Sequence, residues 1–200
     1  RYSDYTIREY IRNFIMSKLE TNTIDTVSGT TNLVIGSTNT STVTLPSGEV
    51  TGHMYPAFEA YLNTEETVSS NNTYEVIPFN IEVIDTDNAY STSTYRFTVP
   101  TGKAGKYFIA VGVRCKASAN TRLINSYGAI YLNGSRYRES QNNSNANYTR
   151  TAQQNTQAIM DLSVGDYVQG YVAINETNTT ANYGDANNKS TYFLGYRIGA

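Results

Sequence analysis

The sequence has very little of the chemistry on which enzymes and metal proteins rely: its 200 residues include one cysteine, one histidine and no tryptophan. A single cysteine cannot form an internal disulfide, and a single histidine in an unrelated position provides neither paired zinc ligands nor a base for a cysteine nucleophile. Cys115 lies on the apolar face of a strand pattern, so we expect it to be a buried hydrophobic residue. We therefore expect no enzymatic activity, no bound metal and no other cofactor.

Charged residues and long apolar runs are also scarce. Charged residues make up 16% of the chain, and the formal net charge is -2. A chain so near neutrality has no electrostatic reason to bind nucleic acid or an anionic membrane. No stretch approaches the ~20 apolar residues that a transmembrane helix needs, and the N-terminus has no signal-peptide core. We expect a soluble protein with no nucleic-acid partner and no membrane insertion.

Tyrosine, by contrast, is abundant, with 18 residues, and Asn, Ser and Thr dominate the predicted loops. Tyrosine gives a binding surface rigid amphipathic area at a small entropic cost, and hydroxyl and amide groups add adaptable hydrogen bonds. This composition favours a protein that binds or assembles over a cytosolic enzyme.

The centre of the chain, from Ser93 to Lys116, shows two strand patterns joined by a turn. In the first, apolar and polar residues alternate from Thr94 to Val99, which is the period of a half-buried strand. Pro100 and two glycines then break the chain. The second run places five residues on one face, which predicts a buried sheet surface: Tyr107, Ile109, Val111, Val113 and Cys115.

Similar patterns recur at similar spacing as far as the C-terminus. The expected strands are 57–62, 74–84, 94–99, 106–116, 126–133, 148–162, 166–175 and 191–198. Many short strands separated by polar turns are typical of an all-β sandwich or barrel. We therefore predict an all-β head over residues 56–200.

Blocks of this head also occur in a known family. The central block is Arg96-Phe97-Thr98-Val99-Pro100, followed by Gly105-Lys106-Tyr107-Phe108. Further blocks occur in the family's order at 76–80, 131–134, 162–168 and 190–196. Together they resemble the globular heads of complement C1q and its tumour-necrosis-factor-like relatives. The resemblance implies a C1q/TNF-like jelly roll of two packed antiparallel sheets, which usually trimerises.

The first 55 residues differ from the head in pattern. Apolar residues at helical spacing predict an amphipathic helix within residues 1–20, and Thr6 with Glu9 can form its capping box. Residues 21–55 carry sparse apolar residues among turns, and the segment from Gly36 to Gly48 resembles bacteriophage tail-fibre shafts, particularly those of marine cyanophages. We expect three chains to associate through these regions. The trimerisation residues are Ile7, Ile11, Phe14, Ile15, Leu33, Ile35, Val43 and Leu45.

The predicted loops are long and polar at one end of the head. If successive strands run up and down, the connections 63–73, 100–105, 134–147 and 176–190 gather at the tip, away from the shaft. The connections 85–93, 117–125 and 163–165 then lie at the shaft end. Long loops without structure of their own are usually functional or disordered. The candidate receptor-binding residues in the tip loops are Arg136, Tyr137, Arg138, Tyr183 and Asp185.

Two pairs of carboxylates invite comparison with glycosidases. Glu65 with Glu66, and Asp85 with Asp87, could hydrolyse a glycan if the two groups of a pair were held at the right separation. Both pairs fall in predicted polar loops, so we expect ordinary solvated acids.

Oxygen-rich stretches also invite comparison with calcium sites. Asp85-Thr86-Asp87-Asn88 begins like a calcium loop but lacks the third acid and the glycine of an EF-hand. Asp185 with Asn187 and Asn188 is a second, weaker match. We expect both stretches to be structural turns.

These features predict a non-enzymatic viral fibre protein on the surface of the virion, as a tail or capsid appendage. Its N-terminal region would contact other virion proteins, and its homotrimeric head would bind a host cell-surface glycan or protein. The alternative is a purely structural virion decoration or minor fibre that binds no receptor. A depolymerase and a secreted cellular protein of the complement-head type are further alternatives.

Overall fold

The computed structural model describes residues 56–145, 149–177 and 181–199, and all regular structure within them is β-strand. The strands are β1 (Ala57–Tyr61), β2 (Glu65–Thr67), β3 (Glu75–Val76), β4 (Ile81–Asp85), β5 (Tyr90–Ser91), β6 (Arg96–Thr98), β7 (Gly105–Lys116), β8 (Leu123–Leu132), β9 (Ser135–Asn143), β10 (Thr151–Leu162), β11 (Tyr167–Glu176), β12 (Asn182–Gly184) and β13 (Tyr192–Gly199). In this part of the chain no helix is long or apolar enough to cross a membrane.

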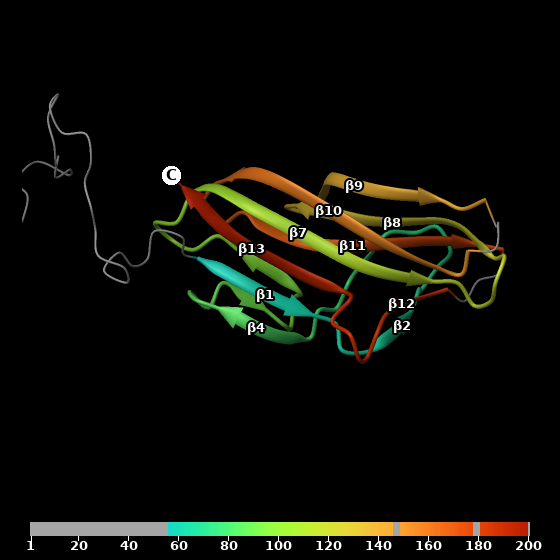
Figure 1. The fold of residues 1–200 in the computed structure, drawn as a ribbon. Helices are drawn as coiled ribbons and strands as arrows, with labels where there is room; N and C mark the ends of the chain where they lie inside the picture. Colours follow the sequence, from blue (N-terminus) through green and yellow to red (C-terminus); the bar gives the residue numbers. More distant parts are fainter. Residues whose placement is uncertain (1–55, 146–148, 178–180, 200) are drawn as a thin grey trace, which may run out of the picture. The chain divides into compact units, whose positions relative to one another are not determined.

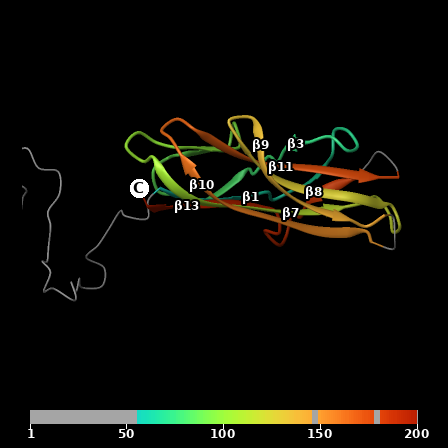
Figure 2. The same cartoon turned by 90° about the horizontal axis from the view of Figure 1, so that it is seen from above.

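The strands form two antiparallel sheets. Sheet A has the order β2-β12-β7-β13-β1-β4, and β10 pairs with the other side of β7. Sheet B has the order β5-β6-β11-β8-β9, and β3 also pairs with β11. Figure 1 shows the strand arrangement, and Figure 2 shows two layers, with β8 and β11 in one and β1, β7 and β13 in the other. This is a jelly-roll sandwich, as the sequence predicted.

The core between the sheets is aromatic. The ring of Phe58 stacks on Phe97 at 4.6 Å between centroids and meets the edge of Phe193 at 4.7 Å. Each of these side chains is almost fully buried, which stabilises the fold by about 1.5–3 kcal/mol per residue. The rings need room, and Gly195 provides it, since a Cβ there would lie 2.8 Å from the Phe58 ring. Phe58 comes from sheet A and Phe97 from sheet B, so these contacts hold the two layers together.

Most of the expected strands are present, and their register is now defined. The expected strand 74–84 is instead interrupted between β3 and β4. Pro78 lies in the interruption, and a proline cannot donate to a sheet ladder. The strands β2, β5, β9 and β12 were not predicted, because three of them have only two or three residues and β9 has no apolar alternation.

The most consequential of these is β9, which pairs with β8 through a tight turn at Asn133 and Gly134. Both turn residues have positive φ, 50° and 79°, as a two-residue type I′ hairpin requires. Asn-Gly between two strands is the strongest short-range signal of a hairpin. The signal was present in the sequence, but residues 134–147 were predicted as a loop.

The predicted N-terminal helix, shaft and trimerisation residues lie outside the described residues. The boundaries proposed for the head, shaft and helix therefore stay predictions.

Candidate functional site

The loops predicted at the tip are divided between the two ends of the sandwich. We call the end where β1 begins the Pro56 end and the opposite end, where β7 finishes, the Lys116 end. Strands β5 and β9 each reverse the chain once, and neither was predicted. The segments 100–105 and 133–134 therefore lie at the Pro56 end, and 117–122 lies at the Lys116 end, each opposite to the prediction. Loops 63–73 and 176–190 lie at the expected end.

Arg136, Tyr137 and Arg138 lie on β9, near the turn at the Pro56 end, rather than in a tip loop. Tyr137 is the extra residue of a β-bulge, because Ile130 pairs with Arg138 and Tyr131 with Arg136, and it is 46% exposed. Arg136 is exposed on the outer face of sheet B, whereas Arg138 donates to the backbone carbonyl of Gln157 on β10 at 3.0 Å. The three neighbours thus point to different surroundings, and a shared role in receptor binding stays a prediction.

Tyr183 and Asp185 lie in or beside β12, in the other sheet. Tyr183 is only 4% exposed, so its ring belongs to the core and is not available as a contact surface. Burial and the nearby Glu75 raise its pKa above the usual range. The burial of Tyr183 was not predicted, because β12 has only three residues and is too short to show an alternating pattern. The structure therefore does not bring the five candidate receptor-binding residues together.

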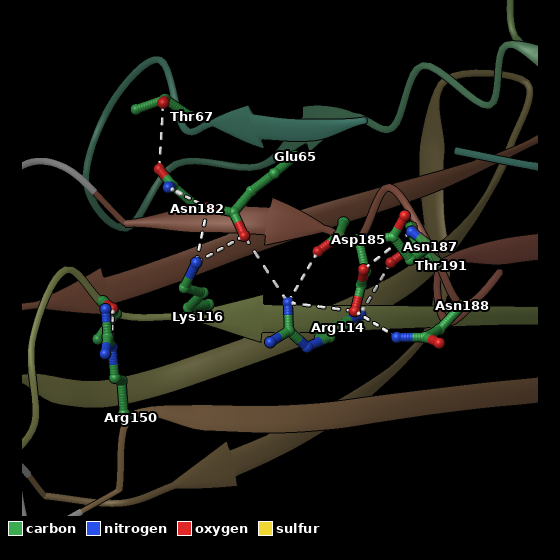
Figure 3. Close-up of polar contacts among 12 residues, drawn as sticks. Glu65, Thr67, Arg114, Lys116, Arg150, Asn182, Asp185, Asn187, Asn188 and Thr191 are labelled. Atoms are coloured by element: carbon green, nitrogen blue, oxygen red, sulfur yellow. Dashed lines mark hydrogen bonds and ion pairs between the residues drawn. The ribbon is translucent and has the colours of Figure 1, made fainter. Parts of the chain in front are cut away.

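Asp185 takes part in a charge network on β2, β12 and β7, drawn in Figure 3. Glu65 lies 2.7 Å from Lys116 and 3.8 Å from Arg114, and Arg114 lies 3.7 Å from Asp185. Arg114 also donates to the carbonyl of Gly184 at 3.1 Å. The network thus fastens the paired strands β2 and β12, and the loop after β12, to β7 in sheet A.

The network also lowers the pKa values of its two carboxyl groups. The hydrogen bond from Lys116 is the main cause for Glu65, with Asn182 and Arg114 contributing. For Asp185 the main causes are hydrogen bonds from the backbone amide of Asn187 and the side chain of Asn188. Both acids remain ionised at neutral pH and are balanced by the two cations. This arrangement suits a structural clamp, because no charge is left over for a ligand.

The acid pairs considered for catalysis have structural contacts of their own. Asp85 accepts hydrogen bonds from the backbone amides of Asp87, Ala89 and Tyr90 at 3.3, 3.0 and 2.8 Å. This is a turn cap of the kind that Asp side chains form in loops. Glu66 accepts a 2.7 Å hydrogen bond from Thr64. The absence of enzymatic activity stays a prediction, but these acids have other roles.

The turn around Asp185 has the same character, with its carboxylate accepting from Asn187 and Asn188 at 3.0 and 3.1 Å. Among the described residues, no group of three His, Cys, Asp or Glu side chains is arranged to hold a metal ion. Cys115 is fully buried, and burial raises the pKa of its thiol to about 12. A protonated thiol in the core is unreactive.

The outer face of sheet A carries a row of apolar side chains across three adjacent strands, at the Pro56 end. Ile159 of β10 pairs with Phe108 of β7, which in turn pairs with Tyr196 of β13. The rings of Phe108 and Tyr196 lie 5.4 Å apart, and Ile159 and Tyr196 are 64% and 37% exposed. Ile198, further along β13, is 44% exposed. We call these four residues the apolar row.

The outer face of sheet B is built from tyrosines. Tyr131 of β8 stacks on Tyr171 of β11 at 3.8 Å between ring centroids, and Tyr74 lies between Tyr127 and Tyr131 at 5.7 and 6.1 Å. Burial raises the pKa values of Tyr74, Tyr131 and Tyr171, and the bond from the Tyr74 hydroxyl to Glu139 adds to the rise. We call Tyr74, Tyr127, Tyr131 and Tyr171 the tyrosine cluster.

The tyrosine cluster was not predicted, although its strand pattern is visible in the sequence. Tyr127 and Tyr131 are four residues apart, as are Tyr167 and Tyr171, so each pair lies on one face of its strand. Only the pairing of β8 with β11 places the two strands side by side. The composition had indicated a tyrosine-rich surface, but not its position.

The two packed antiparallel sheets define a jelly-roll β-sandwich domain. The sequence matches the C1q domain family over residues 57–198, and the chain therefore belongs to that family. The predicted all-β C1q/TNF-like jelly roll is therefore confirmed for the head, and its trimerisation stays a prediction.

Solved structures with this fold include murine APRIL at pH 5.0, which has a TM-score of 0.52 and 8% sequence identity, with 74% of this chain and 100% of that chain covered. The Eiger TNF of S. frugiperda has a TM-score of 0.52 and 10% identity, with 74% and 96% covered. The globular domain of zebrafish complement 1qA has a TM-score of 0.45 and 16% identity, with 72% and 97% covered. No curated protein sequence matches the chain.

Proposed function

We propose that the chain is a non-enzymatic binding protein whose head forms a homotrimer and attaches a viral fibre to the surface of a host cell. The observation that carries the proposal is the contrast between the outer faces of the two sheets. The apolar row on sheet A would be costly to leave in water, whereas sheet B exposes polar and tyrosine side chains. Copies of the head associate through sheet A and leave sheet B and the end loops for other partners.

The viral assignment is supported by the sequence ahead of the head. The segment from Gly36 to Gly48 resembles phage fibre shafts, and the amphipathic pattern before it suits attachment to other virion proteins. The chain is then a surface appendage of the virion, on its tail or capsid. Three weakly binding heads per fibre would give strong attachment through multivalency.

The first test measures mass and binding together. Light scattering of the full chain gives a trimer in the proposed state, and a stable monomer of 22.2 kDa at micromolar concentration would contradict it. Labelled trimer is then added to a panel of marine cyanobacteria and other bacteria. Selective, saturable binding to some of them supports an adhesin whose receptor is a host glycan or protein.

A second function, a structural virion protein without receptor binding, is favoured by one observation. The residues predicted to form a single receptor site are dispersed, and Tyr183 is buried. For this function, the trimer binds none of the cells, and deletion of the head prevents particle assembly. Particles that assemble without the head but fail to adsorb to cells would exclude it.

A further inference from the structure

A cavity of about 370 Å³ lies beside the β5–β6 hairpin. Its volume falls in the lower part of the range of about 300–1,000 Å³ that is usual for small-molecule sites. Its polar lining comes from the loop after β4, from the hairpin and from β6: Asp87, Asn88, Ser91, Thr94, Arg96 and Thr98. Hydroxyl, amide, carboxylate and guanidinium groups thus converge on one small space.

Arg96 is the unusual member of this lining. Its guanidinium lies 4.7 Å from the centroid of the Tyr167 ring, and among the described residues it forms no ion pair with a carboxylate. Arg136 provides an internal comparison, because it also lies over a tyrosine, Tyr74, at 5.0 Å but is paired with Glu139 at 2.9 Å. Glu139 neutralises Arg136, whereas the N–H donors of Arg96 remain available to a carboxylate of a ligand.

Hydrogen bonds within the protein hold the shape of the cavity. The carboxylate of Asp85 fixes the loop 86–90 through the three backbone amides described above. The amide of Thr98 donates to the carbonyl of Ala89 at 2.8 Å, which ties the loop to β6, and the hydroxyl of Tyr90 donates to the carbonyl of Phe79 at 2.8 Å. A preformed site loses little entropy on binding, so even a small ligand can be held.

Among the described residues of the lining, Asp87 is the one carboxylate. Lys103 lies 3.6 Å from it, so its charge is partly balanced. Its oxygens can accept hydrogen bonds from ligand hydroxyls, while Arg96 can bind a carboxylate with two parallel hydrogen bonds. A ligand that matches this lining has one carboxylate and several hydroxyls on a compact frame.

We propose that this cavity binds a uronic acid unit of a host surface glycan, with its carboxylate on Arg96 and its hydroxyls on Asp87, Ser91, Thr94 and Thr98. The proposal rests on the proposed function and gives its receptor a chemical class, an acidic polysaccharide. It also moves the receptor site from the tip loops to the β5–β6 hairpin. Arg96 is a binding residue here, and Tyr167 positions it.

The test uses the full chain and D-galacturonic acid, with D-galactose as the uncharged counterpart, and measures binding by saturation-transfer NMR and calorimetry. We expect the acid to bind and the neutral sugar to bind at least about tenfold more weakly, since it leaves Arg96 unpaired. Arg96→Gln should lower affinity for the acid about tenfold or more, and Arg96→Lys should lower it less, because the charge is kept and the fork is lost. Arg150→Gln is the matched control and should leave affinity unchanged, because Arg150 lies at the Lys116 end and donates to the carbonyls of Ala117 and Ser118.

Thr94→Val provides a second variant that keeps the arginine, and the melting temperature of every variant shows whether it is folded. Equal binding of galactose and galacturonic acid, or equal affinity of folded Arg96→Gln and wild type, would overturn the proposal. Inorganic phosphate, added as a competitor, tests for a general anion site: displacement of the acid by phosphate at the acid's own concentration would overturn the sugar class.

The same variants on cells separate this proposal from the proposed function. If the trimer binds cells and Arg96→Gln abolishes both sugar and cell binding, both stand. Cell binding that survives Arg96→Gln, without any binding of galacturonic acid, overturns the cavity proposal alone. Binding of galacturonic acid through Arg96 by a protein that adheres to no cell overturns the attachment function alone.

Discussion

The outer faces of sheets A and B belong to the same sandwich, yet the apolar row on one and the tyrosine cluster on the other differ in chemistry. On sheet A, the apolar row exposes aliphatic and aromatic surface at the Pro56 end, and the charge network lies toward the Lys116 end. On sheet B, the tyrosine cluster pairs its rings with one another and carries a flanking ion pair between Arg136 and Glu139. The apolar row stays partly exposed in a single chain, whereas the side chains of the tyrosine cluster contact one another within the chain.

In the proposed function, this difference separates assembly from recognition. Apolar area that stays exposed is a reason for copies to associate, since the free energy gained grows with the area buried. A face of stacked tyrosines is stable in water and gains little from self-association. The cavity with Arg96 opens beside β6, in sheet B. Assembly through sheet A would leave that sheet accessible.

The largest expected effect is on assembly, and it tests whether the faces differ as proposed. Ile159→Glu places a charge in the apolar row and should convert the trimer to a monomer, because an unpaired charge in an interface costs several kcal/mol. Tyr137→Glu is the control on sheet B, at 46% exposure, and should leave the trimer intact. Light scattering gives the mass of each. If both variants stay trimeric, another surface holds the chains together.

A smaller effect is expected from the tyrosine cluster, on stability and not on mass. Tyr131→Ala removes the ring stacked on Tyr171 and should lower the free energy of unfolding by about 1–2 kcal/mol. Tyr137→Ala should change it by less than about 0.5 kcal/mol, because that ring lies at the surface. Urea unfolding measures both. Equal effects would mean that the cluster is no more than a set of surface side chains.

Adding one methyl group in the turn between β8 and β9 should lower the free energy of unfolding. Gly134 has a φ of 79°, which costs a residue with a Cβ about 1 kcal/mol, so Gly134→Ala should be destabilising by that amount. Ser135→Ala, next to it, should be nearly neutral. Urea unfolding again gives the two values. A stabilising Gly134→Ala would show that the backbone of the turn is not as described.

The smallest effects concern pH, and they differ in direction between the sheets. The pKa of Glu65 on sheet A is lowered from 4.5, so its contribution is present above that pH and is lost as the pH falls through the lower, folded value. The pKa of Tyr131 on sheet B is raised from 10.0 by burial, so its contribution is lost as the pH rises above 10.0. The free energy of unfolding, measured across pH, should fall at acid pH (the acid limb) and at alkaline pH (the alkaline limb).

Single substitutions then assign each limb to its sheet. Glu65→Gln should flatten the acid limb only, by less than about 1 kcal/mol since the pair is partly exposed. Tyr131→Phe should flatten the alkaline limb only. Core tyrosines also contribute to the alkaline limb, so the measured quantity is the difference between variant and wild type. A variant that alters both limbs would indicate a general change in packing.

The strongly patterned part of the fold could be read from the sequence. The alternation in 106–116 matches β7 to within one residue, and 166–175 matches β11 equally well. In both strands every second residue is buried, and a buried position requires an apolar residue, so the sequence alternates. Cys115 was expected in the core and lies there.

The Asn133-Gly134 turn before β9 carried a hairpin signal that could have been used, but most of the rest depends on partners in space. Strand β9 is exposed over nearly its whole length, so its residues have no reason to alternate. Because β5 and β9 were not predicted, several loops were assigned to the wrong end of the sandwich. Arg136, Tyr137 and Arg138 were then assigned to a tip loop. The cavity lining also lacks a motif, since Asp87 and Arg96 come together only through the β5–β6 hairpin and the cap on Asp85.

Strands β9 and β10 lie at the edges of their sheets on the same side of the sandwich, and this has a consequence for protein held at high local concentration. Open edge strands recruit strands from other chains and start aggregation. Here the hydroxyls of Ser140 and Thr156 lie 2.9 Å apart across the two edges, Arg138 occupies the carbonyl of Gln157, and the bulge at Tyr137 interrupts the ladder. Many copies can therefore be crowded together without this side of the domain acting as a seed for amyloid-like growth.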